Sequence, residues 1–210
     1  HLLLGKTGVL VVGYAGLASL VLIISGLLTW WPRRGQWRKS LRMKANAAPL
    51  RSLYDWHKLT GLVSLIPLLV LGATGTMLAL PKETDAVLSP ILGAPVWPPF
   101  ARAQAADAAP VVMISPSVAV DTGQKALPGA RIAWIAAPPS AGGVYQLRVQ
   151  VPGDPSRRFP HSYIDVDARS GAVTSVFDVR EKGPSNTLKN WLHPLHDGSV
   201  LGGAIELSLS

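Results

Sequence analysis

Residues 8–31, GVLVVGYAGLASLVLIISGLLTWW, carry no charged side chain, and neither do residues 59–80, LTGLVSLIPLLVLGATGTMLAL. An α-helix with the length of the first stretch measures roughly 36 Å, enough to cross a hydrocarbon core of ~30 Å with some tilt. A buried hairpin of a soluble protein, or a signal peptide for the first stretch, could have a similar composition. Two uncharged runs of this length, the first without a small-residue cleavage site, favour two membrane-spanning helices.

The connection between the two spans, residues 32–58, is strongly basic. Its only acid is Asp55, and its cations are Arg33, Arg34, Arg38, Lys39, Arg42, Lys44, Arg51 and Lys58. Because basic loops stay on the cytoplasmic side of a membrane, we expect residues 32–58 to be cytoplasmic and residues 81–190 to lie outside the cytoplasm. The formal net charge of +8 is therefore a signal of topology and does not indicate nucleic-acid binding.

Residues 81–190 are numerous enough for one small α+β domain. The Pro- and Ala-rich residues 81–110 predict a linker with little regular structure. A helix over residues 115–127 follows, with Ser115 as its N-cap, and then four strands over residues 130–136, 144–151, 162–166 and 172–179. We expect this helix to pack on an antiparallel meander, in which no familiar catalytic motif occurs.

The last residues, 191–210, end in an apolar run, and we expect them to begin a third span of a longer chain. The predicted fold class is a membrane α-helical bundle with two complete spans and the start of a third. A small extracytoplasmic α+β domain is inserted into this bundle. The sequence has no cysteine, which excludes disulfides, iron–sulfur clusters and covalently attached haem in these residues.

His57 stands where the basic connection meets the second span. An imidazole at that depth is costly to bury, and neutral imidazole is the commonest metal ligand among side chains. Gly61 follows on the same helical face, where a glycine lets a flat macrocycle or a neighbouring helix approach closely. His57 is therefore a candidate haem ligand. The alternative is an interfacial histidine solvated by lipid headgroups.

Several motifs together carry a resemblance to a known family. WWPRR at residues 30–34 follows an apolar helix, DWHKLTG at 55–61 opens the next one, and Thr74-Gly75 lies near its outer end. The outer segment contributes LPGARIAWIAAP at 127–138, YIDVDARSGAV at 163–173 and WLHPLHDGSVLGG at 191–203. In this combination the chain resembles the PepSY-associated transmembrane family of bacterial inner-membrane proteins.

The resemblance implies a core of four helices, of which this chain would supply the second, the third and the beginning of the fourth. It also implies an extracytoplasmic PepSY-type domain in residues 81–190. Some members of the family are siderophore-iron reductases that hold b-type haems across the membrane, and others have no assigned activity.

The resemblance also implies ligands for two haems b in the full-length protein. His57 would bind the haem near the cytoplasmic face, with its partner on the missing first helix. His196, placed before Gly202 as in the family motif, would bind the outer haem, with a partner just upstream of His1. His193 and His1 are further candidates beside these positions. The alternative for His193 and His196 is a capped helix entry.

The leading hypothesis is a multi-pass inner-membrane haem oxidoreductase. It would pass electrons from a cytoplasmic-side donor to ferric iron outside, held by a siderophore or another ferric chelate. Arg157 and Arg158, beside Phe159, could attract an anionic chelate, although a solvated loop is the simpler explanation for them. His161 is expected at the surface. The alternatives are a non-enzymatic PepSY-type module that binds or restrains a partner protein, and a transporter accessory subunit.

Overall fold

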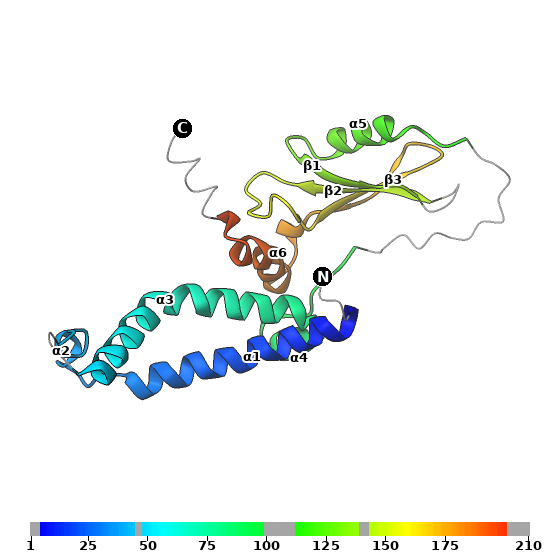
Figure 1. Cartoon of the computed structure of the whole chain (residues 1–210). Helices are drawn as coiled ribbons and strands as arrows, with labels where there is room; N and C mark the ends of the chain where they lie inside the picture. The colour runs from blue at the N-terminus through cyan, green and yellow to red at the C-terminus, as the bar shows by residue number, and fades with distance from the viewer. Residues whose placement is uncertain (1–4, 45–47, 99–111, 139–142, 201–210) are drawn as a thin grey trace. The chain divides into compact units, whose positions relative to one another are not determined.

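Figure 1 shows a computed structural model of the chain, which describes residues 5–44, 48–98, 112–138 and 143–200. The elements in chain order are α1 (Gly5–Trp30), α2 (Trp37–Ser40), α3 (Pro49–Ala79), α4 (Pro81–Leu92), α5 (Pro116–Ala126), β1 (Arg131–Ala136), β2 (Val144–Gln150), β3 (Ser162–Asp167), β4 (Val173–Phe177), the 3-10 helix η1 (Val179–Glu181) and α6 (Pro184–His196). They form two compact units that divide after Pro81.

The first unit consists of two long apolar helices and the basic connection between them. The mean hydropathy reaches 2.3 in α1 and 2.0 in α3, and both helices are long enough to cross a membrane. α3 begins at Pro49, so residues 49–58, which were expected in a loop, are helical. Ion pairs of Asp55 with Arg51 and Lys58, at i,i+4 and i,i+3 spacing, stabilise these additional turns.

Glycines let α1 and α3 approach closely at one end of the pair. A Cβ atom on Gly13 would lie 2.5 Å from Leu80 Cγ, and one on Gly16 would lie 2.6 Å from Thr76 Oγ1. On Gly72 of α3, a Cβ atom would lie 2.9 Å from a leucine methyl of α1. Larger side chains at these positions would push the helices apart, so the sequence fixes the closed end of the pair.

The other end of the pair, next to the basic connection, is open. A Cβ atom on Gly26 of α1 or on Gly61 of α3 would have no neighbouring atom within 4 Å. Pro67 has no N–H to donate to the carbonyl of Val63, and Figure 1 shows that α3 bends in this half. Because the two helices do not close on each other here, a groove remains between them.

Asp55 fastens the basic connection to α3. Its side chain is 1% exposed and accepts hydrogen bonds from Lys58 Nζ at 2.8 Å and from the backbone N–H of Lys44 at 3.3 Å. Arg51 Nε lies 3.4 Å from the same carboxylate. The single acid of this segment therefore holds the end of the loop against the helical turn that carries His57.

The second unit is built on a four-stranded antiparallel sheet in the order β1-β2-β3-β4, with α5 on one face (Figure 1). Ser115 caps α5 by accepting a hydrogen bond from the N–H of Val118. The core lies between α5 and the sheet, and its most buried side chains include Leu147, Val149, Ile164 and Val166. These elements match the helix and the meander expected from the sequence.

The expectation of a linker over residues 81–110 is wrong for its first part, because Pro81–Leu92 form α4. Pro81 occupies the first helical position, where a missing N–H costs nothing. α4 and the segment after it are held to α6. Lys189 Nζ lies 2.5 Å from Asp85 Oδ1, and the backbone of Val96 exchanges two hydrogen bonds with the amide of Asn186. These tertiary contacts stabilise α4, although the proline-rich composition of the segment predicted a linker.

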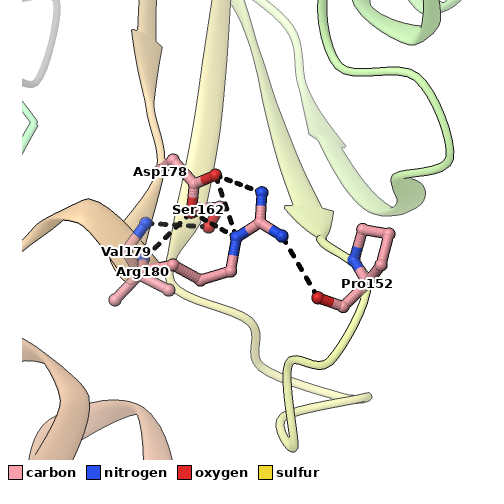
Figure 2. A network of polar contacts seen from close by, with 5 residues as sticks. All are labelled: Pro152, Ser162, Asp178, Val179 and Arg180. Atoms are coloured by element: carbon pink, nitrogen blue, oxygen red, sulfur yellow. Dashed lines mark hydrogen bonds and ion pairs between the residues drawn. The ribbon is translucent and has the colours of Figure 1, made fainter.

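A polar network fixes the connection from β4 to α6 (Figure 2). The Arg180 guanidinium lies against Asp178, with Nη2 2.6 Å from Oδ2, and donates from Nη1 to the carbonyl of Pro152 at 3.2 Å. The N–H of Val179 donates to Ser162 Oγ at 3.1 Å. Arg180 keeps the pKa of Asp178 below its usual value. The network therefore joins η1 to the start of β3 and to the loop after β2, which sets where α6 begins.

A second polar cluster ties α6 to the sheet and includes His161, which is not the surface residue expected from the sequence. Asn190 of α6 donates from Nδ2 to Asp154 Oδ1 at 2.7 Å, so its Oδ1 accepts from His161 Nδ1 at 3.1 Å. Burial, together with the positive charge of Arg148, lowers the pKa of His161 to about 4. The sequence does not reveal this environment, because α6 supplies it from far along the chain.

A substitution at Gly123 of α5 would test how tightly this helix packs on the sheet. A Cβ atom there would lie 2.2 Å from Leu147 Cδ1, and Leu147 is fully buried. We expect Gly123→Leu to lower the free energy of unfolding of this unit by about 1–3 kcal/mol through overpacking. Gln124→Leu, at the next and exposed position, is the matched control and should have little effect. Denaturant unfolding followed by near-UV circular dichroism measures both, and equal effects would contradict the packing described.

The buried state of His161 predicts a dependence of stability on pH. Its folded pKa of about 4 lies below the unfolded value near 6.5, so between these values only the unfolded chain binds a proton. Stability should therefore fall as the pH falls from about 6.5 to about 4, by about 3 kcal/mol in total. His161→Gln, which keeps a donor for Asn190, should remove this part of the slope. Unfolding free energies at pH 7 and pH 5 for both proteins give the comparison, and identical slopes would refute the assignment.

Candidate functional site

The groove between α1 and α3 is the first candidate site. It has a volume of about 620 Å³, and apolar side chains of both helices, among them Leu22, Ile23 and Leu65, form most of its wall. This volume is within the range of pockets that hold small molecules and cofactors. Gly26 and Gly61 also line the groove. Because neither has a neighbour at its Cβ position, the walls are flat at these two points.

Most polar groups in the groove wall already have hydrogen-bond or ion-pair partners in the protein. Ser25 and Thr29 donate their hydroxyls to carbonyls of their own helix, at 2.9 and 2.7 Å. Lys58 pairs with Asp55, and its Nζ also lies 5.7 Å from the centre of the Tyr54 ring. These side chains therefore present little unsatisfied polarity to the groove.

His57 is the exception. It lines the groove and lies more than two turns inside α3, instead of at the mouth of the helix. Within the part of the chain that the structure describes, its imidazole has no hydrogen bond, ion pair or ring contact. An uncommitted imidazole beside two open glycines fits a flat macrocycle with an iron atom at its centre. The groove lining contains no other histidine among the described residues.

The second candidate site is at the end of α6, where His193 and His196 lie one helical turn apart. Burial and the charge of Arg148 lower the pKa of His193, which favours the neutral imidazole that binds metals. Its Nδ1 atom is buried and has no hydrogen-bond partner among the described residues. The ring of His193 also lies 4.9 Å from that of Phe159. The orphaned nitrogen makes His193 as suitable a ligand as its neighbour.

His196 is exposed in the last turn of α6, and its charge influences His193. The structure therefore brings the two histidines of the HPLH sequence together on one helix, whereas His57 belongs to the other unit. Residue 191, where a third span was expected to begin, lies inside α6. His1 lies outside the described residues.

Over residues 5–44, 48–98, 112–138 and 143–200, no three or more His, Asp or Glu side chains are grouped so as to hold a metal ion. A haem needs less from the chain, because its macrocycle supplies the equatorial ligands and one or two side chains bind axially. The histidines on α3 and α6 could supply these one or two ligands.

Two features of the site were not singled out from the sequence. Asp55 was noted only as the lone acid of a basic loop, although its spacing to Lys58 was a signal for a helical ion pair beside His57. The contact of Phe159 with His193 joins the loop after β2 to α6, and no local pattern predicts it.

Comparison with known proteins identifies the family. The family model described as "PepSY-associated TM region" matches residues 1–209. No curated protein and no solved structure matches the chain. The two helices long and apolar enough to cross a membrane agree with the family description. The chain is thus a membrane protein and belongs to the PepSY-associated transmembrane family.

Proposed function

We propose that this protein is a haem-containing inner-membrane oxidoreductase that passes electrons across the membrane to extracytoplasmic ferric iron bound by a siderophore. The observation that supports it best is the groove between α1 and α3, where the uncommitted imidazole of His57 lies beside Gly26 and Gly61. A helix pair that served only as a scaffold or a membrane anchor would not require an unpaired imidazole beside two glycines in an open groove.

In this proposal the haems supply the one-electron chemistry, and the chain holds them in place. His57 would bind the haem nearer the cytoplasmic face, and Asp55 fixes the turn of α3 from which it projects. His196 provides the ligand near the outer face, and the orphaned nitrogen of His193 makes that residue an alternative. The apolar wall of the groove excludes water from the macrocycle.

The proposed direction of transfer follows the distribution of charge. The basic connection supports a cytoplasmic position for the His57 end of the helix pair, where an electron donor would deliver one electron for each Fe(III) reduced. The acceptor is a ferric chelate on the outer side. Reduction weakens such a chelate, because Fe(II) suits hard oxygen ligands less well than Fe(III) does.

A non-enzymatic binding module is the second candidate function. It is favoured by the sheet unit, whose core between α5 and the strands is complete without a cofactor. In that case the histidines are structural, and residues 111–180 would bind a partner protein outside the cytoplasm. Loss of partner binding on deletion of residues 111–180, from a protein that contains no haem, would support this function.

The haem ligands can be tested one at a time in the purified full-length protein. We expect a Soret band that shifts on reduction with dithionite. His57→Ala and His196→Ala should each remove one haem, because each deletes the axial ligand of a different site. His161→Gln, which changes a histidine bound to Asn190, is the control and should retain both. Protein without any haem absorbance after expression with ample haem supply would contradict the proposal.

The shape of the groove gives an independent test that leaves His57 unchanged. Gly61→Leu should fill the space beside the imidazole and remove the inner haem, because no neighbouring atom now occupies that position. Val63→Leu, on the same helix at an exposed position outside the groove lining, is the matched control. Haem content per polypeptide is measured for both variants. Equal haem content would show that the groove is not the binding site.

A further inference from the structure

The face of the sheet opposite α5 carries a row of aromatic and cationic side chains. Side chains alternate along a strand, so residues paired across neighbouring strands share a face. Trp134 of β1 pairs with Arg148 of β2, Arg148 pairs with Tyr163 of β3, and Tyr163 pairs with Phe177 of β4. The row therefore crosses all four strands on the side that α5 leaves uncovered.

Phe159, in the loop before β3, organises one end of this row. The Arg148 guanidinium lies 5.9 Å from the centre of the Phe159 ring and 5.5 Å from that of Tyr163. Arg158 lies 5.4 Å from the centre of the Phe159 ring. The rings of Trp134 and Phe159 are nearly parallel, with an interplanar angle of 8°. Rings and guanidinium groups are thus already in contact with one another before any ligand arrives.

We call the exposed Trp134 and Arg158, together with the partly buried Arg148 and Phe159 beside them, the Trp134 surface. Trp134 is 55% exposed, and its Nε1 donates to the carbonyl of Arg158 at 2.9 Å, which fixes the indole in place. A large aromatic side chain that is fixed and yet exposed is typical of a binding surface.

The charge of the Trp134 surface is positive. Arg131, paired with Gln150 on the same face as Arg148, donates from Nη2 to the carbonyl of Arg157, the residue before Arg158. Acidic side chains near the Trp134 surface are fewer than these arginines. Asp197 is close enough to Arg158 to feel its charge, and Asp165, which faces the same side, is buried and bound to Gln146. The excess of guanidinium groups favours an anionic ligand.

The Trp134 surface also adjoins His193, one of the candidate haem ligands on α6. Phe159 contacts Trp134 on one side and His193 on the other, with ring centroids 6.5 and 4.9 Å apart. A ligand stacked on the free face of Trp134 would therefore be separated from His193 by two aromatic rings, those of Trp134 and Phe159.

We propose that the Trp134 surface binds a ferric chelate whose iron ligands are anionic aromatic rings, namely a tris-catecholate. Such a ligand offers flat rings to stack on Trp134 and negative charge to pair with Arg148 and Arg158. A neutral trihydroxamate chelate has neither feature and gains little there. The inference rests on the proposed function for the fate of the iron and narrows its substrate to one chemical class.

The test uses gallium(III) chelates, because gallium(III) has the charge and coordination of Fe(III) and is not reduced. Full-length protein in phosphatidylcholine nanodiscs is titrated by calorimetry with a gallium tris-catecholate and with a neutral gallium trihydroxamate. We expect the catecholate to bind and the trihydroxamate to bind at least about tenfold more weakly. Arg158→Gln and Trp134→Leu should each weaken catecholate binding by about tenfold.

Arg169→Gln is the matched control, since it removes the same charge from the turn between β3 and β4, at the other end of the strands. Its affinity should equal that of the unchanged protein. Near-UV circular dichroism verifies that the Trp134→Leu protein is folded. If that variant does not fold, the test relies on Arg158→Gln, which changes an exposed side chain. Equal affinity for both chelates, or affinity unaffected by Arg158→Gln and Trp134→Leu, would overturn the proposal. The proposal would also be overturned if Arg158→Gln changed the affinity only in nanodiscs of anionic lipid. That result would show that the surface binds lipid headgroups.

The binding experiment is separate from the question of haem. A protein with a normal haem spectrum that does not bind the gallium catecholate would refute this inference alone. A haem-free protein that binds it at the Trp134 surface would refute the proposed function and leave the surface as a binding site.

Discussion

The close approach of α1 and α3 at Gly13, Gly16 and Gly72 is the constraint on which the helical unit depends. The helices meet at one end because these residues have no side chains to separate them. α3, which contains Pro67, bends in the half next to the basic connection (Figure 1), and the same pair is open around Gly26 and Gly61. The glycines that contact the other helix produce the closed end, and the bend of α3 separates the helices at the other end, where Gly26 and Gly61 have no neighbours. The candidate site of His57 is a consequence of this asymmetry.

The sheet unit positions its histidines by a different means, through buried polar contacts. Asp178 and Arg180 fix the chain before α6, and Asn190 ties the helix itself to Asp154 and His161. Such contacts are costly to break one partner at a time, because a buried polar group would be left unsatisfied. α6 is therefore held firmly, and with it His193 beside Phe159. This rigidity is what a ligand site close to a binding surface requires.

Much of the fold could be predicted from the sequence because its signals are local. Uncharged runs predicted α1 and α3, and Ser115 followed by proline predicted the start of α5. The features that escaped prediction depend on contacts between distant segments. α4 is held by Lys189 and Asn186, which lie about a hundred residues later. His161 is covered by distant segments, through its hydrogen bond to Asn190 and the ring of Trp97. For the candidate site, His57 was evident from its place where the basic connection meets the second apolar span, whereas the groove beside it arises from the packing of two helices.

The proposed function gives the two histidine sites separate roles in one transfer, and its central claim is that His57 is an axial ligand of iron. The most direct measurement is electron paramagnetic resonance of the oxidised full-length protein, in which iron bound by two histidines gives a low-spin ferric signal. The account predicts two such signals, one of which is lost from His57→Ala while the other persists. A spectrum of His57→Ala identical to that of the unchanged protein, or no haem signal in either, would contradict it.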